Sequence, residues 1–226
     1  MKNNYIQEMF NNISPHYDFL NHLLSLNIDR IWRRKAIKHL HLNNDTKIVL
    51  DVACGSGDMC RLLEKQYSTL KIFGLDFSHN MLKLAKKKVN HSKLVLADVY
   101  AAPFKYEMFD RIVTAFGFRN FPDKKKALLE LYKLLKENGI LCILELTNPE
   151  SNKLFSFFFN VYFKKLLPFI GGIISKDFHA YSYLPKSVYN FPKESILKEM
   201  ILSSSFKHVE FIHMTFGLCS AIICYK

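Results

Sequence analysis

The sequence predicts an α/β fold in which a mostly parallel sheet carries helices on both faces. Strand-like apolar runs alternate with helical patterns through the middle of the chain, and two more strand-like runs lie near its end. This alternation indicates βαβ units, whose crossover helices bury both faces of a parallel sheet. With 226 residues, of which 49% are hydrophobic and 23% charged, the chain can build one such domain.

The pattern predicts five parallel strands first. We expect them near residues 47–52, 71–76, 93–98, 109–116 and 140–146, with helices near 58–66, 79–90 and 123–137 between them. A further helix is expected near 193–204. The runs HVEFIHM and GLCSAIICY follow it, with too few residues between them for a helical crossover, so they should form an antiparallel hairpin. The sheet then has seven strands.

We divide this single domain, residues 1–226, into four segments. They are an aromatic, amphipathic N-terminal helical cap (1–45), a cofactor-binding core (46–146), a substrate-cap insertion (147–192), and a terminal helix with the hairpin (193–226). The first and third segments fall outside the βαβ pattern, so we expect them to cover the edge of the sheet where ligands bind.

Charge and cysteine content limit the classes of function. The formal net charge of +12 suits nucleic acid, anionic lipid or an acidic substrate, and does not choose among them. The five cysteines are odd in number and lack C-x-x-C spacing, which favours neither a disulfide framework nor a zinc site, and we expect no metal. The chain shows no signal peptide and no clean apolar run of about 18 residues, so we expect a cytoplasmic protein.

The stretch VLDVACGSGD places a glycine turn directly after the first strand. Because glycine has no Cβ, the backbone of Gly55, Ser56 and Gly57 can approach a bound cofactor closely. A dinucleotide fingerprint would need a third glycine where Cys60 stands, and a pyrophosphate would be repelled by Asp51. S-adenosylmethionine, which carries an ammonium and a sulfonium, suits an acid here. A plain tight turn is the alternative.

Three further acids stand at the ends of successive strands: Asp76, Asp98 and Glu145. Asp76 lies about 20 residues after the turn, where an acid accepts hydrogen bonds from ribose hydroxyls in nucleotide-binding folds. We expect Asp98 to accept from the adenine amino group, and Met81 and Val99 to pack against the adenine ring. For any one of these acids, capping a helix is an open alternative.

Segments outside this core resemble the UbiE/MenG family of quinone C-methyltransferases, which are class I S-adenosylmethionine-dependent methyltransferases. MFNNISPHYDFLN, WRR, LDVACGSGD, FDRIVTAFGFRNFPD, ILELTNP, LPFIGGIISKD and YSYLPKSVYNFP stand in that family's order over nearly the whole chain. FGFRN and YxYLxxSxxxFP are the specific elements. The resemblance implies a Rossmann-like class I methyltransferase fold and S-adenosylmethionine as methyl donor. Ser56 and Ala115 depart from the family's usual threonine and serine, and Ala115 thereby loses one of its possible contacts to the cofactor.

The resemblance implies methyl transfer to a ring carbon of a polyprenyl hydroquinone, in menaquinone or ubiquinone biosynthesis. Ring carbon nucleophilicity rises when a ring hydroxyl, with a pKa near about 10, loses its proton. We expect Arg119 to stabilise that phenolate, with Asn120 and Tyr17 holding the hydroxyl or a relaying water. The alternative is a structural Arg119 paired with Asp18 or Asp123.

A prenylated quinol lies in a membrane, which bears on the expected partners. The insertion is rich in phenylalanine, which suits either a channel for the prenyl tail or a buried packing helix. A basic enzyme of this kind would contact anionic lipid at the inner face of the cell membrane, through lysines such as Lys153, Lys164, Lys165 and Lys176. A homo-oligomer is an open alternative.

Three other functions remain as alternatives: a methyltransferase for a different small phenol, one for nucleic acid, and a non-catalytic scaffold that binds S-adenosylmethionine. An amino-methylating enzyme for nucleic acid would want an Asn/Asp-Pro-Pro-aromatic loop where this chain has AFGFRN, so we expect no nucleic-acid partner. Nothing in the sequence separates a naphthoquinol from a benzoquinol substrate.

Overall fold

The computed structural model describes residues 8, 11, 25–147 and 178–226. Its sheet has seven strands in the order β3-β2-β1-β4-β5-β7-β6. The five strands that come first in the chain are parallel, and β7 pairs antiparallel with both β5 and β6. The strands are β1 (Ile48–Val52), β2 (Lys71–Asp76), β3 (Lys93–Leu96), β4 (Phe109–Ala115), β5 (Leu135–Leu146), β6 (His208–Met214) and β7 (Cys219–Tyr225). The predicted sheet and terminal hairpin are confirmed.

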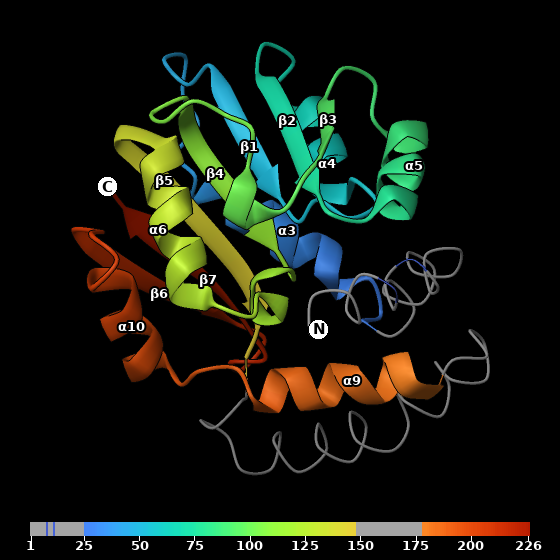
Figure 1. Cartoon of the computed structure of the whole chain (residues 1–226), viewed down its shortest axis with the longest axis vertical. Helices are drawn as coiled ribbons and strands as arrows, with labels where there is room; N and C mark the ends of the chain where they lie inside the picture. Colours follow the sequence, from blue (N-terminus) through green and yellow to red (C-terminus); the bar gives the residue numbers. More distant parts are fainter. Residues whose placement is uncertain (1–7, 9–10, 12–24, 148–177) are drawn as a thin grey trace.

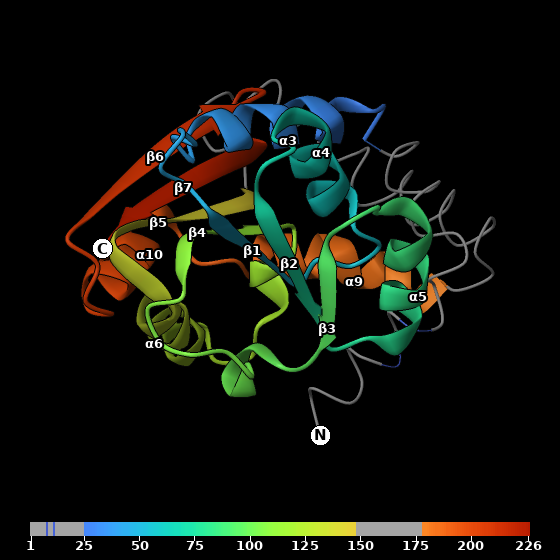
Figure 2. The same cartoon turned by 90° about the horizontal axis from the view of Figure 1, so that it is seen from above.

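Helices cover both faces of the sheet, as predicted (Figures 1 and 2). On one face lie α3 (Ile28–Lys38), α4 (Asp58–Gln66) and α5 (His79–Lys88); on the other lie α6 (Lys124–Leu134) and α10 (Glu194–Leu202). Each group buries its apolar side against the sheet, which gives the domain one core on each face. Both cores leave the ends of the strands uncovered.

In the described part of the N-terminal segment, helix α3 packs on one face of the sheet, and Asn11 accepts a hydrogen bond from the Ser78 hydroxyl beside the end of β2 (2.6 Å). In α3, Trp32, Ala36 and Ile37 are buried in the core shared with α4. The Trp32 indole N–H also donates to Thr215 Oγ1 (2.9 Å), which ties this helix to the turn of the terminal hairpin. Most of residues 1–24, including Tyr17, lie outside the described residues.

One boundary was predicted wrongly. The helical pattern predicted a helix to residue 137 and a strand from 140, but α6 ends at Leu134 and β5 begins at Leu135. Leu135 is fully buried and pairs with Phe109, after which the register shifts so that Ile140 pairs with Arg111. Lys136–Gly139 form the bulge between these pairs, with Asn138 at φ 59°.

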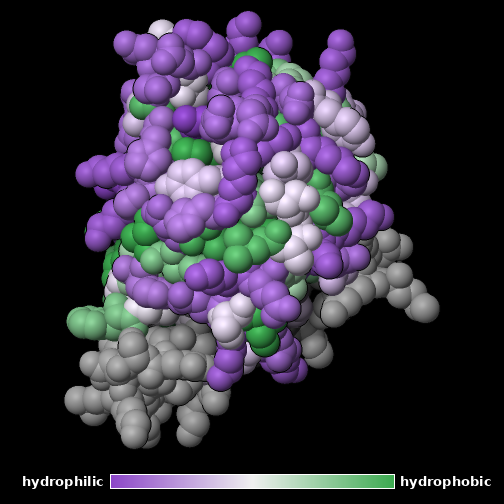
Figure 3. All heavy atoms as spheres, turned by 90° about the vertical axis from the view of Figure 1, so that its left-hand side faces the viewer, coloured by the Kyte–Doolittle hydropathy of each residue, from purple (hydrophilic) through white to green (hydrophobic). Residues whose placement is uncertain are grey.

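Helix α9 (Phe178–Tyr189) crosses below the carboxyl ends of the parallel strands (Figure 1). It belongs to the predicted insertion, of which residues 148–177 lie outside the described part. The sheet ends on the edge strand β6 at the left of Figure 1, and that side of the molecule shows a band of apolar residues between hydrophilic ones (Figure 3). The fold therefore places α9 across the edge where an open parallel sheet binds ligands.

Candidate active site

A pocket opens at the carboxyl ends of β1, β2, β3 and β4. It brings together residues from four separate segments of the chain, 52–55, 75–81, 97–100 and 115–122. Those predicted for the site that line it are Gly55, Asp76, Met81, Asp98, Val99, Ala115 and Asn120. Most of its other lining is apolar, including Leu75, Phe77, Phe116 and Phe121, as is common in small-molecule sites.

The glycine turn is tied to the end of β2 by Asp76. The Gly55 N–H donates to Asp76 Oδ2 (2.8 Å), and the Ser78 N–H donates to Oδ1 (2.8 Å). Ser78, rather than Asp76, caps α5, since its hydroxyl accepts from the Met81 N–H. Burial raises the pKa of Asp76 to about 6 despite these hydrogen bonds. The carboxylate lines the pocket and keeps lone pairs for a ribose.

Gly55 and Gly57 are glycines for different reasons. Gly55 has φ +54°, and a Cβ there would meet nothing within 4 Å, so its open side belongs to the pocket. Gly57 has φ +84°, and a Cβ there would lie 3.0 Å from Ala85 Cβ. Ser56 is buried and accepts from Lys88 Nζ (3.0 Å). Ser56 and Gly57 thus pack toward α5 and do not line the pocket, and their contact with a cofactor stays a prediction.

Asp51 is fully buried at the end of β1, behind the pocket rather than in its lining. Its Oδ2 accepts from the Cys60 thiol (3.3 Å), and its Oδ1 has no hydrogen-bond partner. Burial raises the pKa of Asp51 to about 7, although the Cys60 hydrogen bond and the charge of Arg33 act in the other direction. A buried carboxylate with an unmet acceptor is costly, and a cationic ligand nearby would relieve that cost.

Two non-glycine residues with positive φ shape the floor of the pocket. Ala53 (φ 54°) follows β1 and Phe116 (φ 62°) follows β4, and both line the pocket. The two turns touch, because a Cβ on Gly117 would lie 2.6 Å from Ala53 Cβ. Such backbone is disfavoured for residues with side chains and is found where the surrounding structure holds a site in a fixed shape.

Asp98 and Val99 form the far wall of the pocket, just after β3. Asp98 is half-buried, and its Oδ1 accepts from the Tyr100 N–H (3.1 Å) at the start of a 3-10 turn, Val99–Ala101. Asp98 therefore caps this turn, which is the alternative role that the sequence left open, and it also lines the pocket. Val99 and Met81 are buried apolar lining residues, which suits an adenine ring.

Arg119 pairs with Glu145, the acid at the end of the next strand. Arg119 Nη1 lies 2.7 Å from Glu145 Oε1, and the Arg119 N–H donates to Oε2 (2.9 Å). The same Nη1 donates to the Phe116 carbonyl. Of the two predicted partners of Arg119, Asp123 instead caps α6, and Asp18 lies outside the described residues, so that pairing stays a prediction. The pair is deeply buried, with Glu145 0% exposed.

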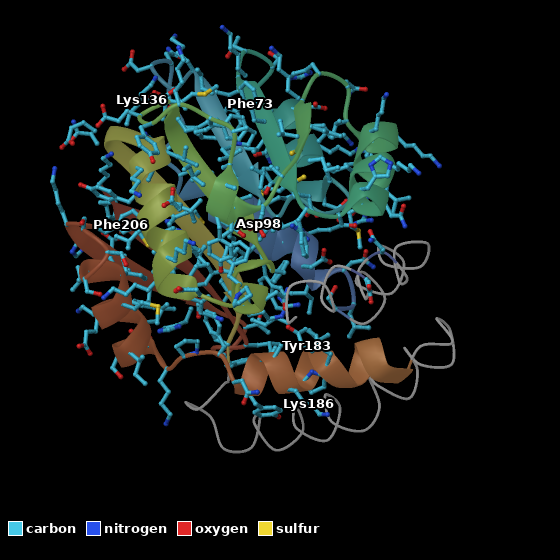
Figure 4. The ribbon with its side chains drawn as sticks, in the orientation of Figure 1. Phe73, Asp98, Lys136, Tyr183, Lys186 and Phe206 are labelled. Carbon is cyan, nitrogen blue, oxygen red and sulfur yellow. The ribbon has the colours of Figure 1, made fainter. Side chains whose placement is uncertain are left out.

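Helix α9 supplies two polar groups to this cluster. The Tyr183 hydroxyl donates to Asn120 Oδ1 (3.0 Å), and the Ser187 hydroxyl accepts from Arg119 Nε (3.2 Å). Tyr183 lies on the side of α9 that faces the sheet, whereas Lys186 lies on the opposite side (Figure 4). Neither Tyr183 nor Ser187 was predicted as a site residue, although both belong to the YxYLxxSxxxFP motif that marks the family.

The pocket fits S-adenosylmethionine by the chemistry of its donors. An acid with an unmet acceptor lies beside the glycine turn, a second acid lies at the end of β2, a third caps the turn after β3, and apolar side chains fill the wall between them. No group of three or more His, Cys, Asp or Glu side chains able to hold a metal ion occurs among the described residues.

Three solved structures share the fold at low identity. A methyltransferase from Aquifex aeolicus aligns with a TM-score of 0.62 at 19% identity, covering 85% of this chain and 88% of that one. One from Methanococcus maripaludis gives 0.67 at 21% identity, covering 94% and 91%. The possible histamine N-methyltransferase of Thermotoga maritima gives 0.65 at 15%, covering 97% and 98%. These proteins are all described as S-adenosylmethionine-dependent methyltransferases.

Curated relatives are closer in sequence. The demethylmenaquinone methyltransferase of Bacteroides fragilis is 40% identical over 97% of this chain and 91% of its own length. That of Thermus thermophilus is 42% identical over 94% and 97%. The ubiquinone/menaquinone biosynthesis C-methyltransferase UbiE of Geotalea uraniireducens is 40% identical over 96% and 94%. The model of the ubiE/COQ5 methyltransferase family matches residues 1–226, and the chain belongs to that family.

Proposed function

We propose that this protein transfers a methyl group from S-adenosylmethionine to a ring carbon of a polyprenyl hydroquinone. The observation that carries the proposal is the buried Arg119–Glu145 pair beside Asn120 and Tyr183, at the mouth of a pocket whose acids suit S-adenosylmethionine. The names of the curated relatives support it, since they describe methylation in menaquinone or ubiquinone biosynthesis.

The residues that would hold the cofactor follow from the pocket. Asp51 would compensate its ammonium, Asp76 would accept from the ribose hydroxyls, and Asp98 would accept from the adenine amino group. Met81 and Val99 would enclose the adenine ring. When bound, the cofactor supplies an electrophilic methyl group on a sulfonium.

Arg119 would stabilise the phenolate form of the quinol. A guanidinium remains protonated in proteins, so Arg119 acts through its charge and its N–H donors and does not accept the proton. Glu145 and the Phe116 carbonyl hold Nη1 in position. The hydroxyl proton would leave through water or a tyrosine hydroxyl, with Tyr183 and the predicted Tyr17 as the candidates. Because a cation then meets an anion, charge is neutralised toward the transition state, and an apolar pocket favours the reaction.

Methyl transfer from labelled S-adenosylmethionine tests the proposal. The acceptors are a reduced prenylated naphthoquinol and, in parallel, a prenylated methoxy-benzoquinol, with Arg119→Ala and the exposed control Lys198→Ala on α10. We expect label on a ring carbon of at least one quinol, loss of about 100-fold or more in kcat for Arg119→Ala, and an unchanged rate for Lys198→Ala. No label on either quinol, despite cofactor binding, would point to another phenol, to nucleic acid or to a non-catalytic scaffold.

We also propose that the enzyme contacts anionic lipid at the cytoplasmic side of the membrane. The predicted lysines of the insertion lie outside the described residues, but α3 and α4 support the proposal. One hollow between α3 and α4 is lined by five cations, with Asp58 and Leu62 beside them: Arg30, Arg33, Arg34, Arg61 and Lys65. Next to it, α3 carries Ile31 exposed at 49%. No helix in the described part of the chain is long and apolar enough to cross a membrane.

Vesicle flotation tests this contact. We expect binding to vesicles with anionic lipid at low salt, weaker binding at high salt, and none to neutral vesicles. The double change Arg30→Gln with Arg34→Gln should reduce binding more than Lys125→Gln with Lys133→Gln on the other face. If the two double variants lost vesicle binding equally, the contact with lipid would lie on another surface than α3.

The same proposal includes one domain in which residues 147–192 cap the substrate. It also includes self-association of the chain. The apolar band on the side of the molecule shown in Figure 3 offers a surface for a second copy. Sedimentation of the purified chain would show a dimer or a monomer directly.

A further inference from the structure

Three acids, Asp51, Asp76 and Asp98, lie in or next to the cofactor pocket, and none of them can pair with the carboxylate of S-adenosylmethionine. S-adenosylmethionine ends in an amino acid group, so an α-carboxylate lies beside the α-ammonium that Asp51 would compensate. A carboxylate near Asp51 and Asp76 would be repelled unless a cation lies close by. The question is which cation of the chain is placed for it.

Two cations near the glycine turn and the site are already held by short ion pairs. Lys88 Nζ lies 2.7 Å from Asp58 Oδ1 and also donates to Ser56 Oγ. Arg119 Nη1 lies 2.7 Å from the buried Glu145. Moving either toward the cofactor would leave a carboxylate uncompensated, and at Glu145 that carboxylate is fully buried.

Arg33 is held differently. Its nearest acid is Asp29 on the same helix, with Arg33 Nε 3.7 Å from Asp29 Oδ2, which is too long for a hydrogen bond. Arg33 Nε is buried and makes no hydrogen bond in the structure. Asp29 Oδ1 meanwhile accepts from the Ser25 hydroxyl (2.8 Å). A buried guanidinium N–H without an acceptor is costly, and a carboxylate is the group that relieves it best.

Arg33 lies next to a residue of the pocket wall. Its Cζ lies 4.9 Å from the centre of the Phe116 ring, and Phe116 lines the pocket. The charge of Arg33 also reaches the buried Asp51 carboxylate. Its helix is fixed by the buried Trp32, whose ring lies 6.2 Å from that of Phe116. Arg33 lines the neighbouring hollow, which it shares with Asp58 of α4, and is separated from the pocket by the Phe116 side chain.

We propose that the Arg33 guanidinium binds the α-carboxylate of S-adenosylmethionine, while Asp51 compensates the α-ammonium. The inference rests on the proposed function only in taking S-adenosylmethionine as the ligand. It assigns a role to the WRR element of α3, and it explains why this helix is packed against the turn after β4. Arg33 thereby becomes a residue that distinguishes a complete cofactor from one without a carboxylate.

Decarboxylated S-adenosylmethionine is the matching probe, since it keeps the ammonium and the sulfonium. Calorimetric titration would measure the Kd of both ligands for the wild type, Arg33→Gln and Arg33→Lys, and for Lys35→Gln as an exposed cation of the same helix. We expect Arg33→Gln to weaken S-adenosylmethionine about 10-fold or more and to leave the decarboxylated ligand within about 2-fold. Arg33→Lys should recover part of the loss, and Lys35→Gln should change neither Kd.

Each other outcome has a definite meaning. Equal weakening of both ligands by Arg33→Gln, or none, would overturn the inference, and a selective loss in Lys88→Gln would move the role to Lys88. If Arg33→Gln fails to fold by circular dichroism, the comparison of Arg33→Lys with the wild type decides, since a shorter and differently shaped cation should still lose affinity for the carboxylate ligand alone. Failure of the wild type to bind S-adenosylmethionine would instead count against the proposed function.

Discussion

Two buried carboxylates on neighbouring elements are treated in opposite ways by this fold. Asp51, in β1, is 0% exposed, with one oxygen accepting a thiol hydrogen bond and the other without a partner. Glu64, on α4, is 6% exposed, and it accepts from three backbone N–H groups and a hydroxyl. Burial raises the pKa of Asp51 to about 7. At Glu64 burial also acts upward, but the Ser92 and backbone hydrogen bonds outweigh it and lower the pKa to about 2.

This difference distinguishes a carboxylate that stabilises the fold from one that serves the candidate active site. Glu64 joins α4 to the loop between α5 and β3, and its charge stabilises the folded chain. Asp51 does the reverse in the ligand-free protein, since its charged form is disfavoured by burial. A residue that lowers the stability of a fold is usually retained because function needs it. Asp51 is such a residue, and it lies beside the glycine turn.

A third buried carboxylate, Glu145, should give the largest effect on catalysis. Glu145→Gln keeps the shape of the side chain but removes the charge that fixes Arg119. We expect kcat to fall about 100-fold while the Kd of S-adenosylmethionine changes less than about 2-fold. The control is Glu137→Gln on the same strand, whose exposed pair with Lys207 should be irrelevant to the rate. If Glu145→Gln weakened S-adenosylmethionine binding as much as it lowered kcat, Glu145 would act in cofactor binding, as Asp51 is proposed to do.

Glu64→Gln should give the largest effect on stability. The pKa of Glu64 lies below its ordinary value of 4.5, so its stabilisation is present above that pH and is lost as the pH falls toward about 2. We expect a loss of about 2–3 kcal/mol in the free energy of unfolding at pH 7. Urea unfolding at pH 7 and at pH 3 would measure it, and the gap from wild type should narrow at pH 3. A gap independent of pH would mean that packing, not charge, is responsible.

The two glycines of the turn offer a smaller test of the same division. Gly57→Ala should lower stability by about 1–2 kcal/mol, because of its positive φ and the 3.0 Å approach to Ala85, with a modest effect on cofactor binding. Gly55→Ala should cost about 1 kcal/mol, since its Cβ meets no protein atom, but it should weaken cofactor binding more. Thermal unfolding and a binding titration on both variants would measure the two effects. If the same variant had the larger effect on both stability and cofactor affinity, the prediction would be wrong.

Much of the cofactor pocket could be predicted from the sequence, because a βαβ pattern brings strand ends to one edge. Gly55, Asp76 and Asp98 were found in this way and line one pocket. The Arg119–Glu145 pair was within reach, since the two residues lie at the carboxyl ends of adjacent parallel strands, but the predicted partners were Asp18 and Asp123. Tyr183 reaches Asn120 from α9, more than 60 residues away along the chain, and no periodicity reports such a contact. The start of β5 was missed because a bulge hides it.

The most direct test of the division between scaffold and site is the affinity of S-adenosylmethionine for Asp51→Asn and Glu64→Gln, measured by calorimetry at pH 6 and pH 8. Since the pKa of Asp51 is about 7 without ligand, the ionised form that favours a cationic ligand is gained between these two values. We predict that wild type and Glu64→Gln bind more tightly at pH 8, and that Asp51→Asn binds about 10-fold more weakly at pH 8 without that gain. Equal affinities and equal pH dependence in the two variants would contradict the account.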